Sequence, residues 1–138
     1  MYPTPIDITD FDARRLRRLL ASYEELPTSS MRELSRLRRE LDRARIVPSH
    51  EVGENVVTMN SQVVLSDLES GQEYTCTLSF PDDANLDAGR LSVLAPVGTA
   101  ILGYREGSVI EWEVPAGPRR FRIEKVLYQP EAAGDYGQ

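Results

Sequence analysis

The sequence predicts an α+β fold, with an N-terminal antiparallel helical hairpin in residues 1–46 and an antiparallel β-sheet domain with one short helix in residues 56–138. Two observations from the residues predict the hairpin and the sheet. The spacing of apolar residues changes at Val56 from three or four to two, which marks a change from helices to strands. The stretch Leu91–Tyr104 joins a strand to a short apolar segment through a proline, and strands are expected on both sides of it. Residues 47–55 form the linker between the two parts.

Two amphipathic helices are expected in the first part. The first spans residues 10–26 and is capped by Thr9 or Asp10. The second begins at Ser30, which forms a capping-box pattern with Glu33, and ends before Pro48. Their apolar faces hold Leu16, Leu19, Leu20, Tyr23 and Leu26 in the first helix, and Met31, Leu34, Leu37, Leu41 and Ala44 in the second. Because each stripe has only about two residues per heptad, it favours a seam between the helices, which is a short coiled coil.

The second part alternates apolar and polar residues in the manner of strands. The strands are expected at Val56–Met59, Ser61–Asp67, Glu73–Phe80, Val109–Val114 and Arg119–Gln129. Short strands joined by tight turns favour a mostly antiparallel sheet.

Leu91–Tyr104, with the sequence LSVLAPVGTAILGY, is the centre of this arrangement. Leu91 and Val93 suit a half-buried strand that Pro96 ends, since proline has no amide hydrogen for a ladder. Pro96 suits the first turn of a helix, and Gly103 suits its end. The apolar residues between them are dense enough to cover a sheet. The tail from Pro130 to Gln138 has little to bury and is expected to be loosely held.

Composition and charge exclude several classes of protein. The 138 residues carry a net charge of −6, divided unevenly into +2 for residues 1–45 and −8 for the remainder. An acidic main domain repels phosphate backbones, so no direct sequence-specific binding of nucleic acid is expected. No apolar window is long enough for a membrane span, and the first ten residues lack the features of a secretion signal. With Cys76 the single cysteine, cytoplasmic residence is the simplest interpretation.

No catalytic or metal-binding constellation stands out in the sequence. His50 lies in the linker without a partner nearby in sequence, and Cys76 is in phase with apolar strand neighbours, which favours a buried, inert thiol. The remaining acidic candidates are more typical of solvated loops and strands than of a calcium loop or a catalytic pair: Asp82, Asp83, Asp87, Glu111 and Glu113. The sequence therefore predicts a binding protein that is not an enzyme and uses no cofactor.

Four segments resemble the family of regulators of nucleoside diphosphate kinase (Rnk), which are relatives of the Gre transcript-cleavage factors. They are VVTMNS (Val56–Ser61), APVGTAILG (Ala95–Gly103), IEWEVPAG (Ile110–Gly117) after the Gly107–Ser108 turn, and YQPEAAGDY (Tyr128–Tyr136). The likeness covers essentially the whole chain, strongly from residue 56 and loosely before it.

This resemblance implies an N-terminal coiled coil joined to a C-terminal domain of FKBP-like fold. Gre-type proteins dock on RNA polymerase near its secondary channel through the C-terminal domain. The docking loop of that family corresponds here to Leu94, Ala95 and Pro96, with Val97 next to it. This chain departs from the Gre pattern in the loop, since Leu94 replaces an acid often found there and Ala95 replaces a serine. The resemblance thus implies a regulator that docks at the rim of the secondary channel of RNA polymerase.

The tip of the hairpin departs further from the Gre pattern. Gre-type coiled coils carry at their tip an acidic pair that holds a magnesium ion at the polymerase active centre. Here the tip contains Glu24, Glu25, Pro27, Thr28 and Ser29, with no Asp-x-x-Glu pair. Helices of this length extend only about 24 Å. We therefore expect the chain to compete with longer Gre-type factors without stimulating transcript cleavage.

Two alternatives remain open from the sequence. An FKBP-like cleft suggests a prolyl isomerase or chaperone, although a shared fold is not a shared function. The hairpin seam suggests a coiled-coil dimerisation module, whereas the main hypothesis assumes a monomer. If the hairpin folds as a separate part, Leu37→Asp is expected to unfold it while the sheet domain stays folded, because burying an unpaired charge costs several kcal/mol, about the whole stability of so small an element.

Overall fold

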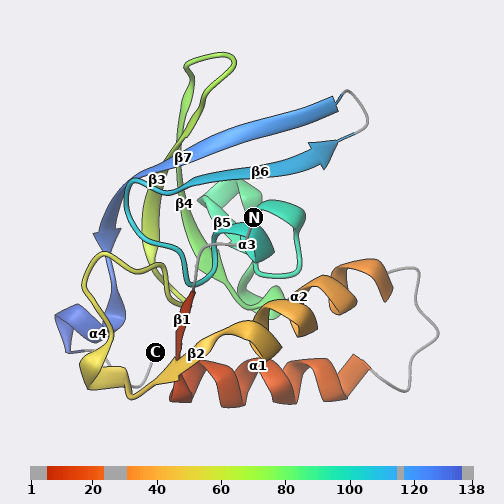
Figure 1. The fold of residues 1–138 in the computed structure, drawn as a ribbon, viewed down its shortest axis with the longest axis vertical. Helices are drawn as coiled ribbons and strands as arrows, with labels where there is room; N and C mark the ends of the chain where they lie inside the picture. Colours follow the sequence, from red (N-terminus) through yellow and green to blue (C-terminus); the bar gives the residue numbers. More distant parts are fainter. Residues whose placement is uncertain (1–5, 24–30, 115–116, 135–138) are drawn as a thin grey trace.

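A five-stranded mixed sheet occupies the upper part of the molecule in the computed structural model, which describes residues 6–23, 31–114 and 117–134 (Figure 1). The strand order is β5-β4-β3-β7-β6, in which the β4–β5 pair is parallel and the other neighbouring pairs are antiparallel. The strands of this sheet are β3 (Gln62–Asp67), β4 (Glu73–Ser79), β5 (Arg90–Ser92), β6 (Val109–Val114) and β7 (Gly117–Tyr128). The α+β class predicted from the sequence is confirmed, and the sheet is mixed, since every neighbouring pair of strands except β4–β5 is antiparallel.

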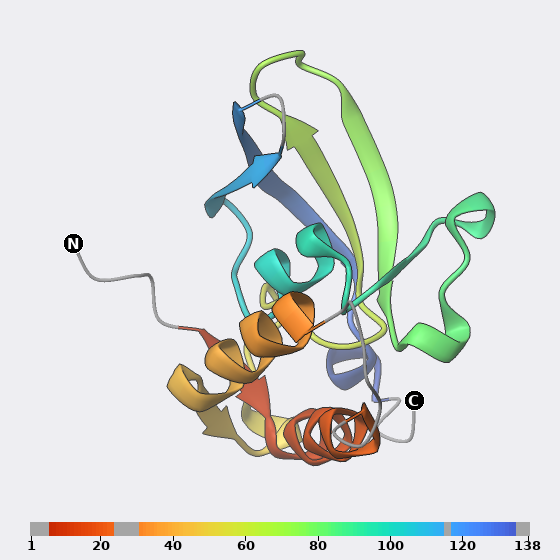
Figure 2. The ribbon, with the colours of Figure 1, turned by 90° about the vertical axis from the view of Figure 1, so that its right-hand side faces the viewer.

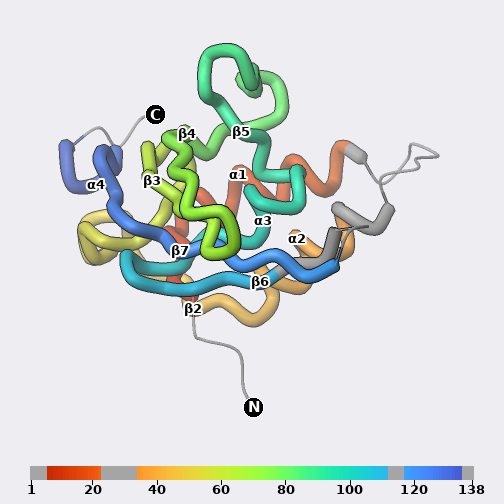
Figure 3. The backbone as a smooth tube through the Cα atoms, turned by 90° about the horizontal axis from the view of Figure 1, so that it is seen from above, coloured from red at the N-terminus to blue at the C-terminus, as the bar shows by residue number. Residues whose placement is uncertain are grey.

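Three helices lie at the other end of the molecule (Figure 1), namely α1 (Asp10–Tyr23), α2 (Met31–Arg43) and α4 (Pro130–Ala133). The fourth helix is α3 (Pro96–Ile101). Helix α3 lies between the sheet and α2 (Figure 2). Between β4 and β5 the chain projects from the body of the molecule and contains two short 3₁₀ turns, Pro81–Asp83 and Leu86–Ala88 (Figure 3).

Two three-residue strands, β1 (Asp7–Thr9) and β2 (Arg45–Val47), form a small parallel sheet beside the helices. Thr9 then caps α1, because its side-chain oxygen accepts a hydrogen bond of 3.0 Å from the Asp12 backbone N–H. Gly103 has a φ of +82°, and an added Cβ there would lie 2.8 Å from the Ile6 Cβ. Glycine at this position therefore lets the chain before β1 approach the segment that follows α3.

The apolar faces of α1 and α2 belong to the same hydrophobic core as the sheet. The buried cluster joins both helices, α3 and the strands, and it includes Leu16, Leu20, Leu34, Leu37, Leu41, Met59, Val63, Leu65, Ile101 and Ile123. Helix α2 also packs against α3. The leucine stripes therefore face the interior of this chain, so they are not free to pair two chains as the dimerisation alternative requires. The boundary at residues 47–55 does not divide the hydrophobic core, and separate folding of the predicted domains 1–46 and 56–138 stays a prediction.

Two local predictions are wrong. Residues 56–59 were expected to be a strand, but only Val56 makes an isolated bridge, to Arg105, and the chain then turns at residues 58–61. The start of the tail was expected to be loosely held, but it forms α4, and Pro130 and Glu131 are buried. The segment after the last strand is therefore part of the folded body.

Candidate docking surface

The strand–proline–helix corner predicted to bind a partner is built by a tight backbone turn. Strand β5 ends at Ser92, whose carbonyl accepts a 3.0 Å hydrogen bond from the Ala95 N–H, and whose hydroxyl accepts one of 3.1 Å from the Leu94 N–H. The Thr99 hydroxyl donates to the Val93 carbonyl at 2.5 Å. These bonds fix the direction in which α3 leaves the sheet.

Gly98 permits the closest contact in this corner. A Cβ at position 98 would lie 2.1 Å from the Ser92 carbonyl oxygen, which is a backbone atom and cannot move aside cheaply. The absence of a side chain is therefore a packing requirement of the corner.

The structure brings the four predicted site residues together at this corner. Pro96 is exposed, whereas Leu94, Ala95 and Val97 are half-buried. Val97 also lines an apolar groove of about 390 Å³ on the adjoining sheet. We call this groove the sheet groove; it is lined by Leu65, Asp67, Tyr74, Thr75, Cys76, Leu86, Gly89, Leu91, Val97, Arg119 and Phe121.

No motif in the sequence marks the sheet groove as a site. Its most exposed apolar side chains are Leu86 at 80% and Tyr74 at 45%. Tyr74 and Cys76 alternate with polar residues along β4, which places both on one face of that strand. This alternation is the part of the groove that the sequence indicates. Leu86 lies in an acidic loop, where neither periodicity nor composition indicates a contact with the sheet.

An ion pair between Asp67 and Arg119 forms part of the lining of the sheet groove. The Asp67 carboxylate accepts a hydrogen bond from Arg119 and two from the backbone N–H groups of Glu69 and Ser70. Burial opposes the charged form, but the hydrogen bonds from Arg119 and the two N–H groups outweigh it and lower the pKa of Asp67. This part of the groove is therefore polar but charge-balanced, while the rest of it is apolar.

Cys76 is the nucleophile nearest to this surface. Burial raises the pKa of its thiol to about 11. The thiol therefore stays protonated near neutral pH, which fits the inert cysteine expected from the sequence.

The remaining sequence candidates do not join this surface. His50 lies in the 3₁₀ turn Ser49–Glu51, and Asp82, Asp83 and Asp87 lie in the exposed connection between β4 and β5. Within residues 6–23, 31–114 and 117–134, no three His, Cys, Asp or Glu side chains are grouped so as to hold a metal ion. The predicted tip residues lie outside the described residues: Glu24, Glu25, Pro27, Thr28 and Ser29.

Comparison with protein-family models matches two regions of the chain. Residues 52–128 match the model described as "Transcription elongation factor, GreA/GreB, C-term", and residues 4–47 match the model described as "Rnk N-terminus". The first match contains the whole corner and the whole sheet groove. No helix among the described residues is both long and apolar enough to span a membrane.

Individual relatives agree with these matches. The regulator of nucleoside diphosphate kinase of Escherichia coli strain K12 is 42% identical over 137 residues, which cover 97% of this chain and 96% of that protein. The transcription elongation factor GreA of Syntrophomonas wolfei is 34% identical over 90 residues, which cover 65% of this chain and 57% of that protein. A solved structure described as a prokaryotic transcription elongation factor GreA/GreB from Nitrosomonas europaea superposes with a TM-score of 0.74 at 39% identity and covers 89% of this chain and 99% of that chain.

Proposed function

The chain belongs to the family of regulators of nucleoside diphosphate kinase (Rnk), which is related to the Gre transcription elongation factors, and from this premise we propose that it binds RNA polymerase at the rim of the secondary channel. The family relation supports a role connected with transcription. The family consists of regulatory factors rather than enzymes, which argues against the prolyl isomerase alternative.

One observation carries the proposal. The corner Leu94–Val97, in which Pro96 is exposed, and the apolar sheet groove adjoin at Val97, so together they present one continuous surface. An apolar centre with a polar, charge-balanced edge has the anatomy of a protein-binding site. Both features lie within the region that matches the GreA/GreB C-terminal family model.

The proposed mode of action is competition. A protein that occupies the polymerase through this surface excludes a longer Gre-type factor from the same rim. Over the residues that the structure describes, helices α1 and α2 span 14 and 13 residues, which corresponds to about 20 Å each. Because the helices are this short, we propose that the bound protein does not stimulate transcript cleavage.

A titration against core RNA polymerase tests the docking proposal. The full chain is expected to bind with a saturable affinity at micromolar concentration or tighter. Pro96→Asp and Leu86→Asp introduce a charge at the corner and at the groove, and each is expected to weaken binding at least about tenfold, as for a central contact of an interface.

The matched control is Ile46→Asp, since Ile46 is an apolar side chain exposed to 46% on β2, outside the corner and the groove. Thermal melts of all three variants verify that they fold. Absence of saturable binding, or equal weakening by the control and the groove variants, contradicts docking through this surface.

A further inference from the structure

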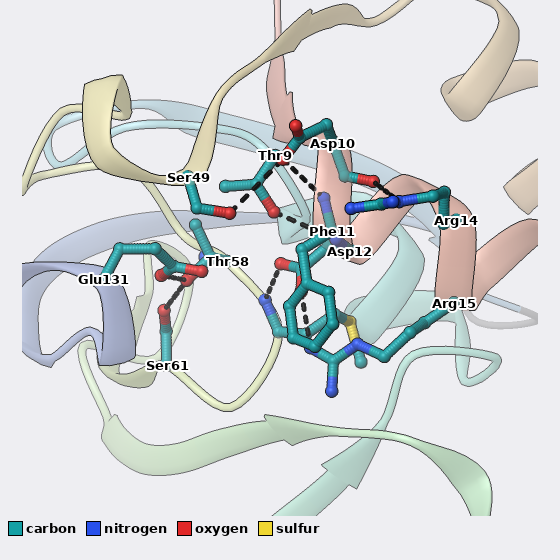
Figure 4. Close-up of polar contacts among 11 residues, drawn as sticks. Thr9, Asp10, Phe11, Asp12, Arg14, Arg15, Ser49, Thr58, Ser61 and Glu131 are labelled. Carbon is teal, nitrogen blue, oxygen red and sulfur yellow. Dashed lines mark hydrogen bonds and ion pairs between the residues drawn. The ribbon is translucent and has the colours of Figure 1, made fainter. Parts of the chain in front are cut away.

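Helix α1 and helix α4 are attached to the same turn of the chain, residues 58–61, by two buried carboxylates (Figure 4). Asp12 of α1 accepts a 3.0 Å hydrogen bond from the Met59 backbone N–H. Glu131 of α4 accepts one of 2.7 Å from the Thr58 hydroxyl. We call this arrangement of Asp12, Thr58, Met59, Ser61 and Glu131 the carboxylate junction.

The turn itself is held rigid by its own side chains. The Ser61 hydroxyl accepts a 2.9 Å hydrogen bond from the Thr58 N–H, and the hydroxyls of Thr58 and Ser61 lie 2.9 Å apart, within hydrogen-bond distance. Thr58 and Ser61 are almost fully buried. A shift of Thr58 therefore also moves the backbone N–H of its neighbour Met59. This N–H donates the hydrogen bond to Asp12.

The α1 side of the junction has a second anchor. Asp12 forms a 2.6 Å ion pair with Arg15, whose guanidinium lies 4.2 Å from the centre of the Phe11 ring and 4.7 Å from that of Phe80. The cation thus lies between an aromatic ring of α1 and one at the end of β4. These contacts fix the start of α1 against the sheet.

The α4 side is anchored by an amide. The Gln129 side chain, which caps α4, donates to the carbonyls of Gly53 and Val56 at 2.7 and 2.8 Å and accepts from the Ala132 N–H at 3.1 Å. Helix α4 is therefore joined to residues 53–58 at two points, through Gln129 and through Glu131.

We propose that α4 acts as a clasp, whose attachment to the 58–61 turn sets the position of α1. The consequence is a conformational coupling between the C-terminal segment and the N-terminal helices, which are far apart in sequence. A partner or a modification that lifts α4 from the turn loosens α1, and displacement of α1 loosens α4 to the same degree, because coupling between two sites is reciprocal. The clasp is a property of the isolated chain and does not depend on RNA polymerase.

Amide hydrogen exchange of the full chain tests this coupling. Glu131→Ala removes the bond to Thr58 and is expected to speed exchange of the α1 amides from Arg14 to Ser22 by about fivefold or more. Glu131→Gln keeps an acceptor oxygen and is expected to leave these amides near their original rates. Should Glu131→Ala fail to fold, Thr58→Val replaces the hydroxyl with a methyl group, which removes the bond to Glu131 together with the contact to the Ser61 hydroxyl, and it is expected to speed exchange of the same α1 amides.

The chain offers a matched control on the sheet. Ser66 of β3 donates a 3.2 Å hydrogen bond to the Glu124 carboxylate of β7, which is also a hydroxyl-to-carboxylate pair but makes no contact with the junction. Glu124→Ala is expected to leave α1 exchange unchanged. Equal acceleration by Glu124→Ala, or unchanged α1 exchange when Glu131→Ala frees the amides of α4, overturns the proposal.

A double-mutant cycle provides the second measurement. Asp12→Ala and Glu131→Ala are expected to be non-additive in the unfolding equilibrium, with a coupling of roughly fivefold or more in the equilibrium constant. Asp12→Ala and Glu124→Ala are expected to be additive. Additivity of the first pair would show that the two carboxylates act independently, which is also contrary to the proposal.

Discussion

At the scale of single residues, Asp7 on the one hand and Asp12 and Glu131 on the other have pKa values that are shifted in opposite directions. Asp7 is held by the guanidiniums of Arg45 and Arg105, with bonds of 2.9 to 3.0 Å, and the bond from Arg45 is the main reason why the pKa of Asp7 is lowered. Burial raises the pKa of Asp12 and also that of Glu131. The negative charge of Asp12 raises the pKa of Glu131 further. Similar carboxylates thus titrate in opposite directions because of what surrounds them.

The first prediction concerns the pH dependence of stability. A raised carboxyl pKa means that the folded state binds more protons than the unfolded state above pH about 4, so stability falls as pH rises through that window. Wild type is therefore expected to gain stability relative to Glu131→Gln as pH decreases from about 7 to about 4.5. Denaturant midpoints across this range measure the difference.

Asp7→Asn serves as the contrast in the same experiment. Because folding lowers the pKa of Asp7, the stabilisation by its charged carboxylate is fully present above the unfolded-state pKa of 3.8. This stabilisation is lost only as pH falls through the lower pKa of the folded state. The cost of Asp7→Asn is therefore expected to be constant from pH 7 to about 4.5 and to shrink below that. Parallel pH profiles for the two variants would contradict both assignments.

The second prediction concerns Gly98. Gly98→Ala forces a Cβ against the Ser92 carbonyl oxygen, and the resulting overpacking is expected to cost about 3 kcal/mol or more of unfolding free energy. At Gly53 the tightest contact of an added Cβ is with the end of the Asn55 side chain, so Gly53→Ala is expected to change stability by less than about 1 kcal/mol. Thermal melts compare the two, and similar costs would show that the corner can relax.

At the scale of elements, α2 shows that the packing partner of an apolar stripe depends on the elements that surround it. Leu34, Leu37 and Leu41 were interpreted as a seam with the first helix, but in the structure they belong to the core shared with α3 and the sheet. A stripe of about two residues per heptad suits either environment. In the folded chain α2 packs against α3 as well as α1, and periodicity does not reveal the second of these neighbours.

The third prediction revises the expected effect of a change at Leu37. Because this side chain is fully buried in the common core, Leu37→Ala is expected to lower the unfolding free energy by about 2–5 kcal/mol in a single cooperative transition. Helical and sheet signals in circular dichroism should decline together. Ser35→Ala, at an exposed position of α2, is the control and is expected to change stability by less than about 0.5 kcal/mol. Two separate unfolding transitions for Leu37→Ala would instead support a hairpin that folds independently of the sheet.

The longer elements and the proposed corner could be predicted from the sequence, whereas the short elements could not. Strands β3, β4, β6 and β7 alternate over six or more residues, and Pro96 marks the start of α3. Strands β1 and β2 have three residues each, which is too few for a periodic signal. Val56–Met59 is rich in strand-forming residues, but tertiary hydrogen bonds such as that from the Val57 N–H to the Tyr104 carbonyl determine its conformation.

The sheet groove and the carboxylate junction are similarly hidden in the sequence. Leu65, Leu91 and Phe121 lie on three different strands, and only the strand order brings them to one surface. Asp12 and Glu131 are more than a hundred positions apart, so no local motif links them. The family resemblance identified the corner because its residues are consecutive.

At the scale of the whole molecule, charge and shape bear on how the chain meets a partner. Residues 1–45 carry a net charge of +2 and the remaining residues carry −8. The two N-terminal helices and the sheet therefore produce electrostatic potentials of opposite sign. Helices α1 and α2 pack against the body rather than extending from it over their described lengths (Figure 2). If the sheet groove binds the polymerase, the helices lie beside the docking surface and do not form a long probe.

The last prediction follows from this shape. In a cleavage assay on backtracked RNA polymerase complexes, the chain alone is expected to produce no cleavage above background, because helices of about 20 Å are too short to carry an acidic pair to the active centre. With a Gre-type factor present, the chain is expected to inhibit cleavage. The concentration of the chain that gives half inhibition should rise in proportion to the concentration of the Gre-type factor. Pro96→Asp should lose the inhibition, whereas Ile46→Asp should keep it. Stimulated cleavage contradicts the short-arm argument, and inhibition that is independent of the Gre-type factor's concentration contradicts competition for one rim, so the assay separates the two parts of the proposal.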